Sequence, residues 1–156
     1  MTKKESISQL LKSKHIAIAG VSSDHKKYSR MIYEAFLDKG YKTSAVNPKL
    51  TEINGNICYH SITELPDDVD ALVIIMRGDK AADILKEGIK KGTKNIWLHQ
   101  GCTLKNLESF TEDKGINLIN GECAFMWLEP VEGFHKFHRF IKHPFTSYNK
   151  QSRPKY

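Results

Sequence analysis

The stretch Asp70-Ala71-Leu72-Val73-Ile74-Ile75-Met76 carries the clearest structural signal in the chain. It is apolar at every position from Ala71 onward and rich in β-branched residues, a pattern typical of strands at the centre of a parallel sheet. Four other short apolar runs, at residues 15–20, 43–46, 95–98 and 116–119, have the length of strands. We therefore expect a sheet of about five strands.

Helical patterns separate these runs. The periodicity i, i+3, i+4, i+7, i+8 predicts one apolar helix face made of Tyr28, Met31, Ile32, Ala35 and Phe36. A second predicted face consists of Ala81, Ile84, Leu85, Gly88 and Ile89. Shorter helices are expected at residues 6–12, 61–65 and 104–110. Alternating strands and helices favour right-handed crossovers, so the sequence predicts a single three-layer α/β domain with a mainly parallel sheet.

The composition is that of an ordinary single domain. The chain has 156 residues, of which 40% are apolar and 27% charged, as in soluble globular proteins. No apolar run approaches the roughly 18–20 residues of a membrane span, and no apolar stretch of signal-peptide length follows the N-terminus. We expect a cytoplasmic protein without membrane contact. None of the three cysteines forms a CxxC pair, so neither a disulfide framework nor a metal site is predicted.

The net charge of +6 belongs to the end of the chain. Residues 134–156 contain six basic residues and no acidic ones, which leaves residues 1–133 with 18 of each. We predict a domain at 1–133 and a basic, aromatic extension at 134–156. Mixed cations and aromatic rings can bind single-stranded nucleic acid, but we favour a helix packed through its phenylalanines, followed by a frayed end. A zinc site around His135 and His138 is a weaker interpretation.

Ligands of open α/β sheets bind in the loops after the strands. The loop at residues 20–30 has only the first glycine of GxGxxG and no Walker sequence. It is polar, contains Lys26, Lys27 and Arg30, and opens a helix, which favours phosphate binding. An ordinary solvated loop would have the same composition, so both interpretations stay open.

The second loop, Val46-Asn47-Pro48-Lys49, carries a cation where NAD sites place an acid. Lys49 suits a ribose that bears a phosphate, as in NADP or coenzyme A (CoA), although it could also be merely solvated. After the third strand, Arg77 could approach a phosphate. Gly78 and Gly101 allow close approach of a ligand, or they serve only as turn glycines.

Taken together, these loops resemble a known family. The matching segments run from about residue 10 to about residue 130. They are Ile16-Ala17-Ile18-Ala19-Gly20-Val21-Ser22, Tyr28-Ser29-Arg30, Gly40-Tyr41, Val46-Asn47-Pro48-Lys49, Gly55, Leu65-Pro66, Val69-Asp70 and Trp97-Leu98-His99-Gln100-Gly101. The chain resembles the small single-domain CoA-binding proteins of the Rossmann type, which are similar to the N-terminal CoA-binding domain of the succinyl-CoA synthetase α subunit.

The resemblance implies that CoA or an acyl-CoA binds across the carboxyl ends of the strands. The implied contacts fall into four groups. Gly20, Val21 and Ser22 would contact the pyrophosphate, with Lys27, Ser29 and Arg30 at the start of the next helix. Val46, Asn47, Pro48 and Lys49 would contact the adenosine. Met76 and Arg77 would lie beside the third strand, and Gln100 and Gly101 would lie on the pantetheine side. The Arg77-Gly78-Asp79 segment departs from the small or proline-rich segment common in this family.

No convincing catalytic set is visible, so we expect a binding module more than an enzyme. Two alternatives are an NADP-dependent oxidoreductase and a nucleic-acid or protein-binding module that acts through the basic extension. A homo-oligomer is left open. His99 is interpreted as a polar lining residue of the cleft more readily than as a catalytic one. Cys102 follows Gly101 at a predicted helix start, where the pKa of a thiol can fall, and a mixed disulfide with the thiol of CoA is a hypothesis for it.

Overall fold

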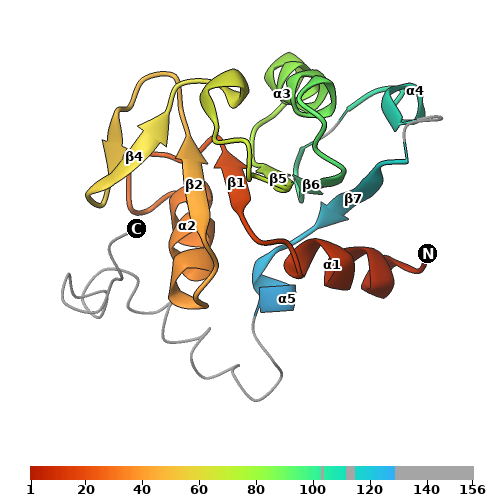
Figure 1. Cartoon of the computed structure of the whole chain (residues 1–156), viewed down its shortest axis with the longest axis horizontal. Helices are drawn as coiled ribbons and strands as arrows, with labels where there is room; N and C mark the ends of the chain where they lie inside the picture. Colours follow the sequence, from red (N-terminus) through yellow and green to blue (C-terminus); the bar gives the residue numbers. More distant parts are fainter. Residues whose placement is uncertain (103, 112–114, 129–156) are drawn as a thin grey trace.

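The structure, a computed structural model, describes residues 1–102, 104–111 and 115–128. This part of the chain forms a seven-stranded sheet with helices on both faces (Figure 1). The three-layer, Rossmann-like α/β class predicted from the sequence is confirmed. The expected extension at 134–156, including the histidines considered for zinc, and the predicted domain limit at residue 133 lie outside the described residues.

The strands are β1 (Ile16–Ala19), β2 (Thr43–Val46), β3 (Glu52–Ile53), β4 (Asn56–Tyr59), β5 (Ala71–Ile74), β6 (Asn95–His99) and β7 (Asn117–Glu122). The helices are α1 (Lys3–Leu11), α2 (Tyr28–Asp38), α3 (Asp79–Lys90), α4 (Glu108–Thr111) and α5 (Phe125–Leu128), with a 3-10 turn η1 (Ile62–Glu64). The sheet order is β3-β4-β2-β1-β5-β6-β7. All neighbouring strands pair in parallel except β3 and β4, which are antiparallel.

The sheet has two more strands than the sequence predicted. Asn54 and Gly55 both adopt positive φ angles, of 56° and 78°, and form the tight turn that their order predicts. They join β3 to β4 at one edge of the sheet. β3 is only two residues long, which is too short for an apolar pattern to reveal.

The sheet divides the core into two layers. Ile18, Val73 and Trp97 face α1, α2 and α5, whereas Ala17, Leu72 and Leu98 face α3 and η1. Because side chains alternate along a strand, a strand buried on both faces must be apolar throughout. This explains the continuous apolar run of β5.

Two predicted helical features need correction. Tyr28 was expected on the buried face of α2, but its side chain is 67% exposed. It is the first residue of the helix and lies beside Phe125, with 6.4 Å between the ring centroids. The helix expected at 104–110 is a single turn in the described residues, α4. Residues 122–128 contribute Ala124, Phe125 and Leu128 to the core.

The amino ends of the strands are held together by a polar cluster. His15 Nδ1 donates to Asp68 Oδ1 at 3.0 Å, and His15 Nε2 lies 2.8 Å from Ser44 Oγ. Lys42 donates to the other oxygen of Asp68, and Asp70 accepts from the backbone N–H of His15. The cluster therefore ties β1 and β2 to the segment before β5.

Among the described residues, no helix is long and apolar enough to span a membrane.

Candidate functional site

The sheet order reverses between β1 and β5. From β1 the chain moves through α2 to β2 on one side, and it later returns to β5 on the other side. The loops after β1, β2, β5 and β6 therefore meet at the carboxyl edge of the sheet, where open α/β folds bind ligands. All of the predicted site residues lie on these loops or at their ends.

Gly20 joins the ends of three strands. Its N–H donates to the carbonyl oxygen of Val46, and its φ angle is 94°. A Cβ atom at this position would overlap the carbonyl oxygen of Ile75. The glycine is therefore required by close packing of the protein's own backbone at the carboxyl edge, independently of any ligand.

The loop from β1 to α2 is braced from beneath by Arg30, which is 4% exposed. Its Nη1 donates to the carbonyl oxygens of Ser22 and Ser23, each at 3.2 Å. Its Nε donates to Glu34 at 3.0 Å and its Nη2 to Asn54 at 2.6 Å. The guanidinium thus faces the protein interior, and its role is to position the loop.

Ser29 has a similar bracing role. It is buried, and its hydroxyl accepts from the backbone N–H of Ser22 at 3.1 Å. The segment from Ser23 to Tyr28, including Lys27, is exposed above these two residues. The cations that remain open to a ligand in this loop are therefore Lys26 and Lys27.

The loop after β2 is bonded to the loop after β1. Asn47 Nδ2 donates to the carbonyl oxygen of Val21 at 2.8 Å, while Asn47 Oδ1 accepts from the backbone N–H of Lys49. Pro48 and Lys49 are exposed. Val46 is only 2% exposed, so it supports the loop from below and offers little surface of its own.

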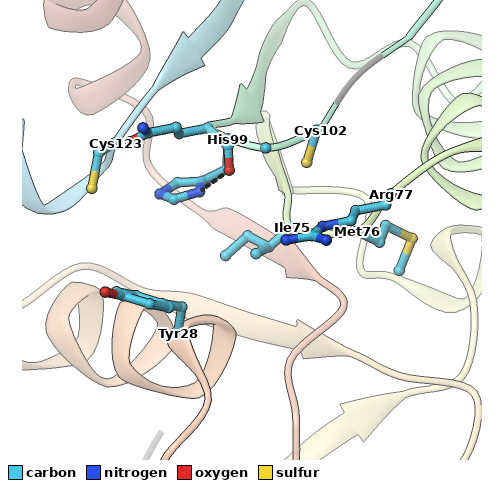
Figure 2. A pocket seen from close by; sticks show the side chains of 9 residues that line it. Tyr28, Ile75, Met76, Arg77, His99, Cys102 and Cys123 are labelled. Atoms are coloured by element: carbon cyan, nitrogen blue, oxygen red, sulfur yellow. Dashed lines mark hydrogen bonds between the residues drawn. The ribbon is translucent and has the colours of Figure 1, made fainter.

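A cavity of about 460 Å³ opens at the carboxyl ends of β5, β6 and β7 (Figure 2). Its walls come from four segments. They are Tyr28 of α2, the run Ile75-Met76-Arg77 after β5, the run His99-Gln100-Gly101-Cys102 at the end of β6, and Cys123 after β7. Four predicted site residues, Met76, Arg77, Gln100 and Gly101, therefore line a single cavity.

His99 is the buried polar residue of this cavity and is 6% exposed. It follows Trp97 by two residues on β6, so it points to the same face as that core residue, toward α2. The pairing of β6 with β7 shifts next to His99. Leu98 pairs with Asn120 but His99 pairs with Glu122, so Gly121 forms a bulge in β7. Bulges commonly re-aim side chains beside functional sites.

The two ring nitrogens of His99 differ. Nδ1 donates to the carbonyl oxygen of Gln100 at 3.1 Å, which leaves Nε2 as an acceptor. Nε2 is buried and has no hydrogen-bond partner within the described residues. Burial lowers the pKa of His99 below its ordinary value, although the bond to Gln100 opposes this shift. A neutral imidazole therefore faces the cavity.

The expectation for Cys102 is wrong. No helix begins there in the described residues, because the next helical turn is α4. The thiol is buried and donates to the carbonyl oxygen of Ile74 at 3.1 Å. Burial raises the pKa of Cys102, despite hydrogen bonds from nearby backbone groups. A thiol in this state is a poor nucleophile, so the hypothesis of a mixed disulfide at Cys102 loses its physical basis.

Sequence reasoning missed three residues of the cavity. The sequence pattern puts Tyr28 on the buried face of a helix and Ile75 inside a strand, and it gives no reason to place Cys123 at a ligand. Cys123 reaches the cavity because of the Gly121 bulge, and the Asn120-Gly121 pair is the local signal that could have indicated an irregularity there.

Residues 14–128, which build every element around this edge, match the CoA-binding domain family. The chain belongs to this family. The resemblance inferred from the sequence motifs is thereby confirmed. The matched range includes all of the predicted site residues.

The chain matches most of the length of one relative and a small part of another. YneT of Bacillus subtilis is 26% identical over 114 residues, which make up 73% of this chain and 84% of YneT. The ADP-forming acetate–CoA ligase of Methanocaldococcus jannaschii is 36% identical over 81 residues, or 52% of this chain. The match covers only 12% of the ligase, so the chain corresponds to a small part of that enzyme.

Solved structures share the fold. A conserved hypothetical protein of Pyrococcus furiosus superposes with a TM-score of 0.67 and 33% sequence identity. The superposition covers 71% of this chain and 96% of the Pyrococcus protein.

Proposed function

We propose that this domain is a binding module for CoA or an acyl-CoA, held along the carboxyl edge of the sheet. The observation that carries the proposal is the family match, which spans the segments that build this edge. The sheet order supports it, because the strand reversal at β1 and β5 lies between the Asn47–Lys49 loop and the cavity.

In this proposal the ligand crosses the edge in one direction. The adenosine and its 3′-phosphate lie at the exposed Pro48 and Lys49, and the pyrophosphate lies over the loop at Gly20, Val21 and Ser22, near Lys27. The pantetheine arm then runs past Met76 and Arg77 toward Gln100 and Gly101. Arg30, Ser29 and Asn47 act indirectly, since their side chains hold the loops in shape.

Isothermal titration calorimetry tests this proposal. CoA, dephospho-CoA, NADP and NAD are titrated into the wild type, Lys49→Ala and Lys4→Ala. We expect saturable binding of CoA that weakens by about tenfold when either the 3′-phosphate or Lys49 is removed, since a charge-assisted contact is lost. Lys4 is an exposed residue of α1, and its replacement should leave the affinity unchanged.

The titration with NADP distinguishes a CoA-binding module from an oxidoreductase. Binding of NADP with an affinity equal to that of CoA would favour an oxidoreductase cofactor site. Absence of saturable CoA binding would contradict the proposal while leaving the fold assignment intact.

A further inference from the structure

The cavity holds a buried acceptor that the protein itself leaves unused. His99 Nε2 is shielded from solvent and has no partner in the described residues. Its neighbour Nδ1 carries the proton that bonds to Gln100. A buried acceptor without a donor is unfavourable, and native structures normally satisfy such atoms. In a cavity wall, a bound ligand can supply the missing donor.

The surroundings of Nε2 restrict what that donor can be. In Figure 2 the imidazole projects from the end of β6 toward the ring of Tyr28, with the side chain of Cys123 to one side. Besides His99, the less exposed part of the wall is apolar or sulfur-containing, with Ile75, Met76 and Cys102. The polar side chains Arg77 and Gln100 are exposed at the rim. The interior therefore suits a small group that offers one hydrogen and needs little other solvation.

The terminal thiol of CoA has these properties. The two amides of the pantetheine arm each carry a carbonyl oxygen, which would need its own donor inside the cavity, and the hydroxyl lies farther from the free end of the arm. A thiol donates one weak hydrogen bond and loses little on transfer from water. It also packs well against the sulfur-containing wall.

Building on the proposed function, we propose that His99 Nε2 accepts the thiol hydrogen of bound CoA and so makes the site selective for free CoA over acyl-CoA. A thioester has no such hydrogen. Its carbonyl oxygen would also bring a second acceptor toward Nε2, which would raise the cost of burying both. His99 is thus a specificity-determining residue at the thiol end of the ligand.

Titration of three ligands into matched variants tests this assignment. CoA, desulfo-CoA, in which hydrogen replaces the thiol, and acetyl-CoA are compared under reducing conditions. We expect the wild type to bind CoA about threefold to tenfold more tightly than either analogue, the range of one neutral hydrogen bond. His99→Asn retains a donor near the Nδ1 position but loses the acceptor at Nε2. For this variant the preference for CoA should fall at least twofold, and only the part that comes from packing of the sulfur atom should remain.

Two further variants serve as controls. His99→Gln places an amide oxygen near the position of Nε2, and it should retain part of the preference for CoA. His60 is an exposed histidine paired with Glu64. Replacing it with Asn should leave the preference of the wild type intact, which separates the loss of this one acceptor from the loss of any histidine.

A spectroscopic readout on the wild type removes dependence on how the variants fold. With ¹⁵N-labelled histidine, the Nε2 resonance of His99 should shift when CoA is added but not when desulfo-CoA is added. Equal affinity for CoA and desulfo-CoA, with an unmoved Nε2 resonance, overturns the role of His99 and leaves CoA binding in place. Failure of all three ligands to bind overturns the proposed function and this inference together.

Discussion

At the scale of single residues, two glycines on the same edge of the sheet differ in what they do. Gly20 and Gly101 have nearly equal φ angles, of 94° and 91°. A Cβ on Gly20 would meet the carbonyl oxygen of Ile75, whereas a Cβ on Gly101 would have no atom within 4 Å. The first glycine is needed for both backbone conformation and space, and the second only for conformation.

Alanine at each position should separate the two effects. Gly101→Ala should lower the free energy of unfolding by about 1 kcal/mol, the cost of a left-handed conformation. Gly20→Ala should lower it by about 3 kcal/mol or more, because the end of β1 must also move away from β5. Urea denaturation measures both values. Equal losses would show that the contact with Ile75 relaxes without cost.

At the scale of elements, α2 contains a buried ion pair that determines the shape of the loop before it. The side chains of Arg30 and Glu34 lie one helical turn apart, 5% and 1% exposed, with Nε and Oε1 at 3.0 Å. Asn54, in the turn between β3 and β4, bonds to both of them. The pair therefore connects α2, the loop at Ser22 and Ser23, and the β3–β4 turn.

Removing one member of this pair should lower the free energy of unfolding more than removing both members. Arg30→Met should lower the free energy of unfolding by about 3 kcal/mol, because the buried Glu34 carboxylate loses its guanidinium partner. The double variant Arg30→Met with Glu34→Leu should recover about half of that loss. Lys26→Met, at an exposed position of the same loop, should have little effect. A double variant no more stable than Arg30→Met would contradict this account. Urea denaturation provides the comparison.

At the scale of the whole molecule, the two ends of the sheet have different tasks. The carboxyl ends form the candidate site, and the amino ends carry the cluster of His15, Ser44, Lys42 and Asp68. The connectivity from Ser44 through His15 to Asp68 is that of a hydrolase triad. However, Ser44 is buried within β2, and a nucleophile must be reachable by its substrate. The cluster is best understood as a cross-link between strands.

The cross-link should make stability depend on pH in acid. Hydrogen bonds from Lys42 and His15 lower the pKa of Asp68 from 3.8 to about 2. Because this pKa is lower in the folded state than in the unfolded state, the carboxylate stabilises the fold above about pH 4, and this contribution is lost as the pH falls from about 4 to about 2. Asp68→Asn should therefore lower the urea midpoint at pH 5 but have progressively less effect toward pH 2.

Two comparisons make this test specific. Asp67, next in sequence and fully exposed, should show a smaller and less pH-dependent effect when changed to Asn. The affinity of Asp68→Asn for CoA at pH 7 should match that of the wild type, because the cluster lies at the opposite end of the strands from the site. A stability difference that is the same at pH 5 and pH 2 would exclude the carboxylate as its source.

Much of the fold follows from the sequence alone, because the signals for it are local. The run of β5, the helical spacing of α2 and α3, and the Asn54-Gly55 turn each depend on neighbours within about ten residues, and all three are observed. The order of motifs along the chain also led to the CoA-binding family. Among the described elements, the sequence did not predict β3, β4 or the short helix α5. These segments of two to four residues mix buried and more exposed side chains, so they lack the continuous apolar run that reveals β1, β2 and β5.

Tertiary structure decided how the candidate site is built, because that depends on contacts between distant segments. Sequence placed Arg30 at the ligand, but its partners Glu34 and Asn54 turn it inward. Sequence offered Cys102 as a reactive thiol, but burial beneath β5 raises the pKa of that thiol. The Gly121 bulge and the parallel register of β6 and β7 bring His99 and Cys123 into one cavity with Tyr28. Local patterns specify which elements form, whereas burial and pairing across the sheet determine which side chains face the cavity.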